Sequence, residues 1–401
     1  MFEISSRARE IRDRMAQFLR ETVLPAEEIY RAQQSASARR WISPQIMEEL
    51  KRKARADGLW NLFLSDARHG AGLSHLDSAQ LAEMLGQSML APEVFNANAP
   101  DAANMEVLLH YGNEFQKRQW LDPLLAGEMR SAWAVTEPDN ASSDPNNVQC
   151  SIVRDGDHYR LSGRKSWVAG AMDARCRFFM VLGQSEPEAK IGARHSILIV
   201  PRDFPGVRCV GTRQIFGYDD EPGGYADLVF DDARVPLAGL LYGEGKGVEM
   251  AQGRIGASRL HQCMRWIGLG ERALRSMVSR AQSRVVYGQP LARMGMAQEA
   301  IARSRCELDA ARLLVLSAAS ALDRGGTRGA RERLAMVKWV VPGSVCAVLD
   351  RAIQWHGSDG LDNQNFLAHA YATVRAQRIS DGPDEMQLLI LARMELERVA
   401  G

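Results

Sequence analysis

The chain of 401 residues is nearly neutral, with 50 Lys and Arg against 49 Asp and Glu and a formal net charge of +1. No overall field therefore favours nucleic acid or an anionic membrane surface as a partner. Hydrophobic residues make up 46% and charged residues 25%, which suits a large core shared by two or three packed domains.

The sequence predicts a cytoplasmic protein that holds no metal. Acidic residues interrupt the Arg-rich start and no apolar run follows it, unlike a signal or transit peptide. The most apolar later stretch carries Lys338, Pro342 and Asp350, so it is too broken to span a bilayer. The six scattered cysteines lack metal-ligand spacing, and we interpret them as buried, reduced thiols.

The first block, residues 1–131, is predicted to be an α-helical domain. Its apolar residues recur at intervals of three and four, as at Ile11 and Met15, which is the period of an amphipathic helix. Pro25 and Pro44 are among the residues that separate one helical stretch from the next.

The middle block, residues 132–240, changes to short runs of alternating polarity. Asp155-Gly156 between two such runs predicts a hairpin. The runs lie at residues 149–153, 159–167, 177–182, 196–200 and 227–230. We expect a small β-barrel or sandwich.

The last block, residues 241–401, returns to the helical period. Long helices are predicted over residues 248–283, 297–324, 330–354 and 363–379. Four long helices with short breaks indicate a four-helix bundle. The predicted fold class is therefore mainly α with a central β-domain, a pattern that by itself identifies no chemistry.

The segment from Trp133 to Asp144 runs from a strand end into a turn of small and hydroxyl-bearing residues. Such a turn exposes N–H groups and hydroxyls to a polar ligand. A purely structural turn closed by Asx and Ser side chains has the same composition, so both interpretations stay open.

The segment from Gly163 to Gly170 places Trp167 at the end of a strand, just before small residues. An indole beside a small-residue loop suits a flat heteroaromatic ligand. A core tryptophan is the alternative.

Three segments of the last block combine arginines with glycine-rich breaks between helices: Gly253 to Arg259, Arg284 to Gly288 and Gln354 to Gly360. Arginines near helix ends hold phosphates. Solvated arginines and C-cap glycines explain the same pattern.

The segment from Arg378 to Glu385 breaks the helical pattern sharply and places Asp381 on an unwound loop. A carboxylate there suits proton abstraction. It also suits an N-cap of the helix that begins near Pro383.

Taken together, in this order and spacing, these segments resemble the acyl-CoA dehydrogenase family. Tyr111-Gly112, Phe216 to Asp220, Gly243 to Gly245 and Asp381 to Glu385 are most similar to the branch that in animals is fused to a kinase-like domain. The resemblance implies an N-terminal helical domain, a middle β-domain and a C-terminal four-helix bundle.

The resemblance also implies FAD as cofactor, acyl-CoA as substrate and a homodimer or homotetramer with FAD near the subunit interface. The implied FAD contacts are Trp133, Val135, Thr136, Ser143, Trp167, Ala169, Arg284, Tyr287, Gln354, Gly357, Ser358, Pro383 and Glu385. The implied substrate contacts are Ser143, Gly256, Ser258, Arg259 and Gly382.

By the same resemblance, Asp381 is the catalytic base, because the family's other base position is Ser258 here. Asp381 removes the α-proton of the thioester, the β-hydrogen passes as hydride to flavin N5, and the product is a trans-2-enoyl-CoA. An electron-transfer flavoprotein then takes the electrons, as in fatty acid β-oxidation. Two residues depart from the common family pattern: Asp381 replaces a Glu, and Ala169 replaces a Ser or Thr.

Related flavoproteins leave two alternatives open. One is an oxidase of the acyl-CoA or nitroalkane type, of which the nitroalkane oxidases also use an Asp base. The other is a non-catalytic flavin-binding homologue on the same fold.

Overall fold

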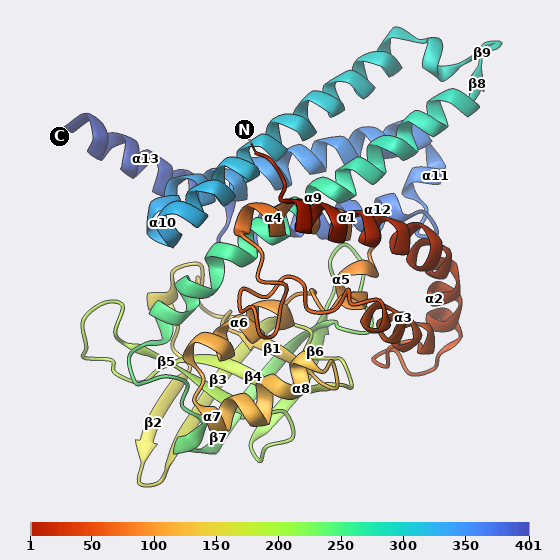
Figure 1. Ribbon diagram of the computed structural model, residues 1–401. Helices are drawn as coiled ribbons and strands as arrows, with labels where there is room; N and C mark the ends of the chain where they lie inside the picture. The colour runs from red at the N-terminus through yellow and green to blue at the C-terminus, as the bar shows by residue number, and fades with distance from the viewer. Residues whose placement is uncertain (1, 401) are drawn as a thin grey trace. The chain divides into compact units, whose positions relative to one another are not determined.

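The computed structural model describes residues 2–400, which divide into two compact units, each described by itself. The bundle unit comprises Met1–Leu24, Leu73–Pro92 and Gly256–Gly401. The sheet unit comprises Pro25–Gly72 and Glu93–Ile255. Figure 1 labels the elements of both.

The bundle unit is built from long helices. They are α1 (Ser6–Phe18), the π-helix η1 (Leu19–Val23), α4 (His75–Leu85), α9 (Gly247–Ser283, which begins in the sheet unit), α10 (Gly295–His356), α11 (Ser358–Leu361), α12 (Phe366–Gln377) and α13 (Asp384–Ala400). A two-stranded hairpin of β8 (Val285–Val286) and β9 (Gln289–Pro290) follows α9, and the 3-10 turn η5 (Leu291–Arg293) leads into α10. Gly326, with φ 59° and ψ −167°, divides α10 into the two helices predicted from the sequence.

Glycines let two of these helices touch backbone to backbone. A Cβ on Gly268 of α9 would lie 1.9 Å from the carbonyl oxygen of Glu83, and one on Gly86 would lie 2.1 Å from that of Arg265. Side chains cannot approach so closely, so only glycine allows this crossing. Arg312 of α10 then bonds Glu83 at 2.8 Å and ties a third helix to the contact.

The sheet unit contains shorter helices and a single sheet. The helical segments are α2 (Leu24–Ala36), α3 (Gln45–Ala56), α5 (Ala91–Val94), α6 (Asp101–Tyr111), α7 (Glu114–Gln116), the π-helix η2 (Lys117–Leu121), α8 (Asp122–Leu125) and the 3-10 turns η3 (Pro145–Asn147) and η4 (Leu237–Gly239). The strands are β1 (Arg130–Ala134), β2 (Ser151–Asp155), β3 (His158–Ala169), β4 (Cys176–Gln184), β5 (His195–Pro201), β6 (Val207–Arg213) and β7 (Tyr225–Pro236).

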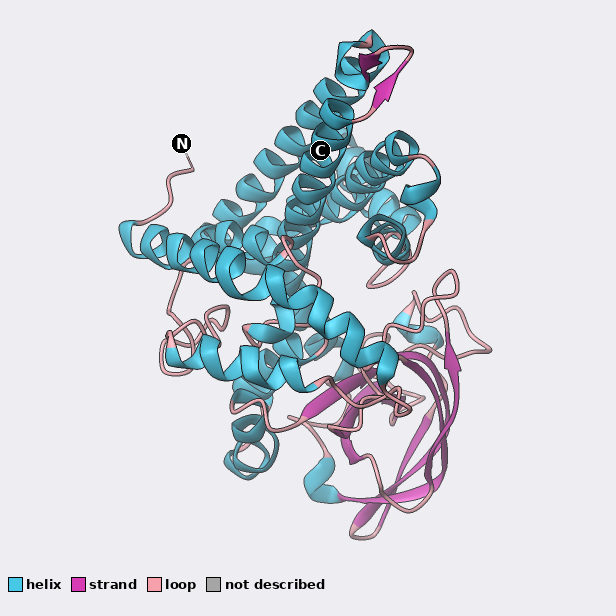
Figure 2. Cartoon of the chain, turned by 90° about the vertical axis from the view of Figure 1, so that its right-hand side faces the viewer, coloured by secondary structure: helices cyan, strands magenta, loops and turns pink. Residues whose placement is uncertain are grey.

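These seven strands form one curled sheet (Figure 2) in the order β1-β4-β2-β3-β7-β6, with β5 on β4. Alternate residues of β4 enter two different cores, as the period of a strand requires. Phe179 and Val181 pack with β1, β2, β3 and β7, whereas Phe178 and Met180 pack with side chains of α6, η2 and α8. Burial on both faces explains why β4 reads as a continuous apolar run.

The predicted fold class is confirmed. In the sheet unit two strands escaped prediction: β1, of which only the end was recognised, and β6, whose residues are mostly exposed; the short strands β8 and β9 of the bundle unit were not predicted either. Cys209 and Cys306 are exposed, so the prediction of buried thiols is wrong for these two, although all six cysteines are free. Among the described residues, no helix is long and apolar enough to cross a membrane.

Candidate active site

In the sheet unit, the turn after β1 exposes two hydroxyl-bearing residues and is closed by a hydrogen bond to a third. The Trp133 ring lies under the Arg254 guanidinium, 4.7 Å from its centroid. The Ser142 hydroxyl accepts the N–H of Glu137 at 2.8 Å, which closes the turn. Thr136 and Ser143 are exposed. The structural interpretation therefore holds for Ser142 and leaves the hydroxyls of Thr136 and Ser143 open to solvent.

A buried ion pair joins this turn to β3. The Lys165 ammonium donates to the Glu137 carboxylate at 2.9 Å and to the Val135 carbonyl at 2.8 Å. Glu137 also accepts the N–H groups of Gln149 and Cys150, at 2.8 and 2.7 Å. Burial opposes ionisation of Glu137, but Lys165 and these N–H donors outweigh burial and lower the pKa of Glu137. Both charges are thus satisfied inside the sheet unit.

Trp167 lies on an irregularity of β3. The pairing of β3 with β7 shifts register between Lys165 and Val168, and Trp167 adopts φ 58°. The Ser166 N–H donates to the Thr136 carbonyl at 2.8 Å instead of to β7. A bulge re-aims a side chain, and Trp167 is 45% exposed. The core interpretation is therefore wrong for this indole, which the bulge turns outward.

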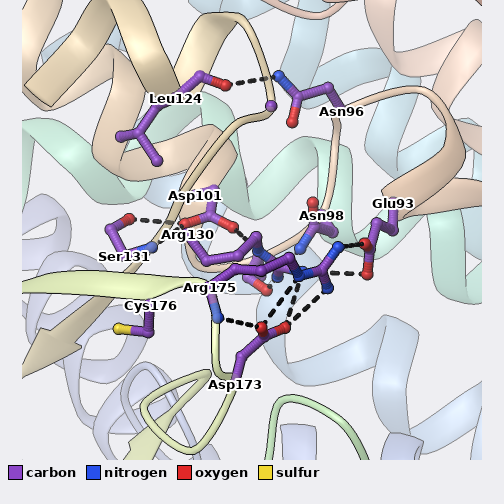
Figure 3. A network of polar contacts seen from close by, with 12 residues as sticks. Glu93, Asn96, Asn98, Asp101, Leu124, Arg130, Ser131, Asp173, Arg175 and Cys176 are labelled. Carbon is purple, nitrogen blue, oxygen red and sulfur yellow. Dashed lines mark hydrogen bonds and ion pairs between the residues drawn. The ribbon is translucent and has the colours of Figure 1, made fainter. Parts of the chain in front are cut away.

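A charged network anchors the start of β1 (Figure 3). Arg130 pairs with Asp101 and with Glu93, the latter at 3.0 Å, and Arg175 contacts Glu93 and Asp173 at 2.7 and 2.8 Å. Burial opposes ionisation of Glu93, but attraction to Arg130 and Arg175 outweighs it and lowers the pKa of Glu93 to about 2. The network fixes the strand that carries Trp133.

In the bundle unit, Asp381 occupies a tight turn between α12 and α13. Its φ is 54° and that of Gly382 is 92°. Its carbonyl accepts from Arg259 Nη2 at 3.1 Å, and the same guanidinium contacts Gln387 Oε1 at 3.4 Å. Among the described residues, neither the carboxylate nor the N–H of Asp381 has a hydrogen-bond partner. The carboxylate therefore does not cap α13, and the turn presents it to solvent.

Two cations, Arg259 and Lys338, contact the backbone of this turn. Burial lowers the pKa of Arg259, with Cys263 and Asp381 acting in the opposite direction. Lys338 of α10 is 3% exposed and donates to the carbonyls of Gln377 and Gly382 at 2.5 and 3.3 Å. The backbone around Asp381 is thus held from α9 and from α10.

At the other end of the bundle unit, the α9–α10 connection is a hairpin with Tyr287 and Gly288 in its turn, at φ 51° and 80°. Tyr287 is 94% exposed and Arg284 is exposed too. Arg280, one turn earlier, bonds the His356 carbonyl at 3.2 Å and Asp359 at 3.0 Å. The end of α9 therefore lies beside the corner that follows α10.

Family models cover most of the chain. The acyl-CoA dehydrogenase N-terminal, middle and C-terminal domains match residues 5–128, 132–233 and 245–396. The "Probable acyl-CoA dehydrogenase FadE2" of Mycobacterium tuberculosis is 46% identical over 99% of this chain and 97% of its own. The chain belongs to the acyl-CoA dehydrogenase family.

Further relatives agree with the predicted branch. "Acyl-CoA dehydrogenase family member 11" of Rattus norvegicus is 44% identical over 99% of this chain, which spans 51% of that protein. The chain thus covers about half the length of this mammalian relative. A solved structure from Mycobacterium abscessus that carries the same family name is 42% identical, with a TM-score of 0.97 over 99% of this chain and 100% of that one.

Within each unit of this acyl-CoA dehydrogenase homologue, the predicted residues gather into three groups. The sheet unit carries Trp133, Val135, Thr136, Ser143, Trp167 and Ala169 on two segments joined by Lys165. The bundle unit carries Arg259, Asp381, Gly382, Pro383 and Glu385 at one end, where α13 begins. It carries Arg284, Tyr287, Gln354, Gly357 and Ser358 around the α9–α10 hairpin and the end of α10.

Several predicted residues have a structural use as well. Gly357 is the C-cap of α10 with φ 66°, as the glycine interpretation expected. Gly256 is buried, and a Cβ there would lie 3.1 Å from the Thr327 hydroxyl, so a larger residue would require the Thr327 side chain to shift. Ser258 is half-buried on α9, one residue before Arg259.

Sequence reasoning missed the residues that hold these groups in place: Glu137, Lys165, Arg280, Lys338 and Gln387. A signal existed for one of them, because a lone lysine inside an apolar helical run needs a buried acceptor. Lys338 was recognised only as an obstacle to membrane insertion.

Proposed function

We propose that the chain is an FAD-dependent acyl-CoA dehydrogenase, an oxidoreductase that acts on a CH–CH group, with Asp381 as the base. The observation that carries the proposal is the Asp381 turn. The carboxylate is exposed and without a hydrogen-bond partner among the described residues, while the carbonyl of the same residue is held by Arg259 at 3.1 Å. A base needs a fixed backbone and a free carboxylate.

The α-proton of a thioester is weakly acidic, so its removal requires both a positioned base and a donor for the charge that develops on the thioester oxygen. Asp381 supplies the carboxylate. Its own N–H, which has no acceptor among the described residues, supplies one donor. Arg259 acts on the turn through the Asp381 carbonyl, which makes it a positioning residue.

The sheet unit fits FAD on one observation: an indole displayed outward by a strained bulge, beside the exposed hydroxyls of Thr136 and Ser143. Trp167 and Ala169 would hold the flavin ring, and Thr136 and Ser143 its polar atoms. FAD, when bound, accepts the β-hydrogen as hydride, which completes a trans-2-enoyl-CoA. The protein's part is to align the substrate and to exclude water.

The exposed hairpin residues support a homo-oligomer. Among the described residues Arg284 and Tyr287 have no side-chain partner. A second subunit's FAD would supply one for each of them, together with Gln354, Gly357 and Ser358 near the corner of α10. We assign the reoxidation of the flavin to an electron-transfer flavoprotein.

The test is anaerobic titration of the purified flavoprotein with a panel of acyl-CoAs, for wild type and for Asp381→Asn. We expect some thioesters to bleach the visible flavin band of wild type. Asn is isosteric but cannot accept the proton, so the variant should bind the same thioesters without bleaching. Bleaching of the variant at the wild-type rate would remove Asp381 from the mechanism.

The same titration separates the other flavoprotein functions. A nitroalkane oxidase would bleach with nitroalkanes and ignore acyl-CoA, and an acyl-CoA oxidase would be reoxidised rapidly by oxygen. Flavin that binds but never bleaches would identify a non-catalytic homologue.

A further inference from the structure

Lys338 is a buried ammonium group whose hydrogen-bond acceptors both belong to the chain around Asp381. One acceptor is the carbonyl of Gln377, the last residue of α12, at 2.5 Å. The other is the carbonyl of Gly382, directly after Asp381, at 3.3 Å. The two contacts bridge 39 and 44 positions of the sequence, so they fix the turn to α10.

Among the described residues, no carboxylate forms an ion pair with Lys338. The titratable and charged groups around it are Cys263 and Arg259 of α9, and Asp381 and Asp384 of the turn and of α13. Burial lowers the pKa of Lys338, and the two aspartates oppose that effect. Asp384 instead forms an ion pair with Arg378 at 2.7 Å. Among the described residues, the hydrogen-bond acceptors of Lys338 are therefore the two backbone carbonyls and no carboxylate.

Packing alone does not explain a lysine at this position. Removing an ammonium from water carries a large desolvation penalty, and two neutral carbonyl acceptors offset it less well than a carboxylate does. An apolar residue would fill the same space without the penalty. The charge is useful at the C-terminal end of α12, where helix carbonyls point towards a cation, and that end leads straight into the Asp381 turn.

Three side chains thus hold two successive carbonyls. Arg259 donates to that of Asp381 at 3.1 Å, whereas Lys338 and Gln387 donate to that of Gly382 at 3.3 and 3.2 Å. The Asp381 carbonyl is bonded directly to the Cα that carries the Asp381 side chain, so fixing this carbonyl and the next one restrains the side chain as well.

We propose that Lys338 is a positioning residue that holds the Asp381 turn in the conformation needed for α-proton removal. The inference rests on the proposed function of Asp381. Lys338 touches neither substrate nor cofactor in this scheme, and it acts on the rate of proton removal and not on the binding of acyl-CoA.

The experiment compares Lys338→Met, Lys338→Arg and wild type as FAD-loaded proteins. Stopped-flow measures the rate of flavin reduction by an acyl-CoA that bleaches wild type, and exchange of the α-hydrogen with deuterated water measures proton removal. A displacement of about 1 Å costs about a hundredfold in rate, so we expect Lys338→Met to slow both reactions about 10- to 100-fold. The dissociation constant for acyl-CoA should not change, and Arg should restore most of the rate.

Lys51→Met is the matched control. Lys51 is 4% exposed; its ammonium also donates to a loop carbonyl, that of Gly127, at 3.3 Å, and unlike Lys338 it pairs with a carboxylate, that of Glu48, at 2.9 Å. Its loss should lower stability without altering flavin reduction. If Lys338→Met loses FAD, Lys338→Gln replaces it, because Gln keeps a donor without the charge.

The possible results distinguish a failure of the proposed function from a failure of the role proposed for Lys338. A wild type that no thioester bleaches contradicts the proposed function itself. A wild type that bleaches, beside a Lys338→Met or Lys338→Gln variant with the same rate, overturns only the role of Lys338. Loss of FAD from both neutral variants, or equal weakening of binding and rate, would assign Lys338 to the fold and overturn the proposal too.

Discussion

The two units treat their buried lysines in opposite ways. In the sheet unit, Lys165 is paired with Glu137 at 2.9 Å, and Glu137 accepts two further N–H groups. In the bundle unit, Lys338 has carbonyl acceptors at 2.5 and 3.3 Å, and the carboxylate of nearby Asp381 has no hydrogen-bond partner among the described residues.

The proposed function accounts for the difference. On that proposal the turn after β1 holds the flavin, and the pairing of Lys165 with Glu137 leaves neither buried charge unpaired there. On the same proposal Asp381 is the base and needs an available carboxylate, and Arg259 and Lys338 bond the backbone of its turn and not that carboxylate. We therefore expect the loss of Lys165 and the loss of Lys338 to have different consequences.

The largest effect is expected from Lys165→Met. Its loss leaves Glu137 as a buried, unpaired charge, which costs about 3–5 kcal/mol of folding free energy. The Val135 carbonyl also loses its donor, so FAD retention should fall together with stability. Urea unfolding and the flavin-to-protein ratio measure both.

The double variant Lys165→Met with Glu137→Leu is the control. It removes both charges, so it should recover a large part of the lost stability. If the double variant loses as much stability as the two single variants added together, the pair is not coupled, and the contrast with Lys338 is weakened.

The next effect is acid sensitivity of the charged network that anchors β1. The pKa of Glu93 falls from 4.5 to about 2 in the folded chain. A depressed pKa means that the stabilisation is fully present above pH about 5 and is lost as pH falls towards about 2. The whole contribution is about 3 kcal/mol, of which about 2 kcal/mol is lost by pH 3.

Urea unfolding between pH 6 and pH 3 tests this for wild type and Glu93→Gln. The variant is less stable at neutral pH, since Arg130 and Arg175 lose an ionic partner, but its stability should fall less on acidification. Parallel pH profiles for the two proteins would exclude Glu93 as the source of the acid sensitivity.

A smaller effect is expected in the bundle unit from Gly382→Ala. Gly382 has φ 92°, and a Cβ there would lie 2.7 Å from Gln387 Nε2. The left-handed backbone costs a non-glycine residue about 1–2 kcal/mol, and Gln387 must give up its contact with the Gly382 carbonyl. We expect this loss of stability together with slower flavin reduction, measured by stopped-flow.

Gly192→Ala is its control, with φ 91° and no atom within 4 Å of the added Cβ. It has a similar backbone cost in a loop of the sheet unit and should leave the reduction rate unchanged. Equal slowing in both variants would mean that the Asp381 turn has no special requirement for its geometry.

The sequence alone predicted the turn at Asp381 but not the side chains that hold it. The Asp-Gly-Pro run breaks a helix in any context, so the turn at Asp381 was predictable from local chemistry. Its contacts with Arg259 and Lys338 join residues 122 and 44 positions apart, which no local pattern encodes. For the same reason β6 escaped prediction: its residues are mostly exposed, and its place in the sheet is set by pairing with β7 and not by a hydrophobic period.

The orientation of Trp167 is a second feature that the sequence alone could not predict. A tryptophan at a strand end is ordinarily a core residue, and only the register shift between Lys165 and Val168 turns it outward. The neighbouring residue on the same stretch, Ala169, pairs with Tyr225 and is half-buried. The side chains that would face the flavin thus depend on the bulge.

The smallest effect is expected from Ala169→Ser, which adds the hydroxyl that many family members carry. A new hydrogen bond contributes about 0.5–1.5 kcal/mol, so rates that depend on the flavin's electronic state should change by about tenfold or less. Stability should not change, because position 169 is half-buried and the added atom is small. Reoxidation of the reduced flavin by oxygen, compared with its reduction by acyl-CoA, measures the effect. A change in both rates by the same factor would point to altered FAD binding, whereas a change in reoxidation alone would place residue 169 against the flavin.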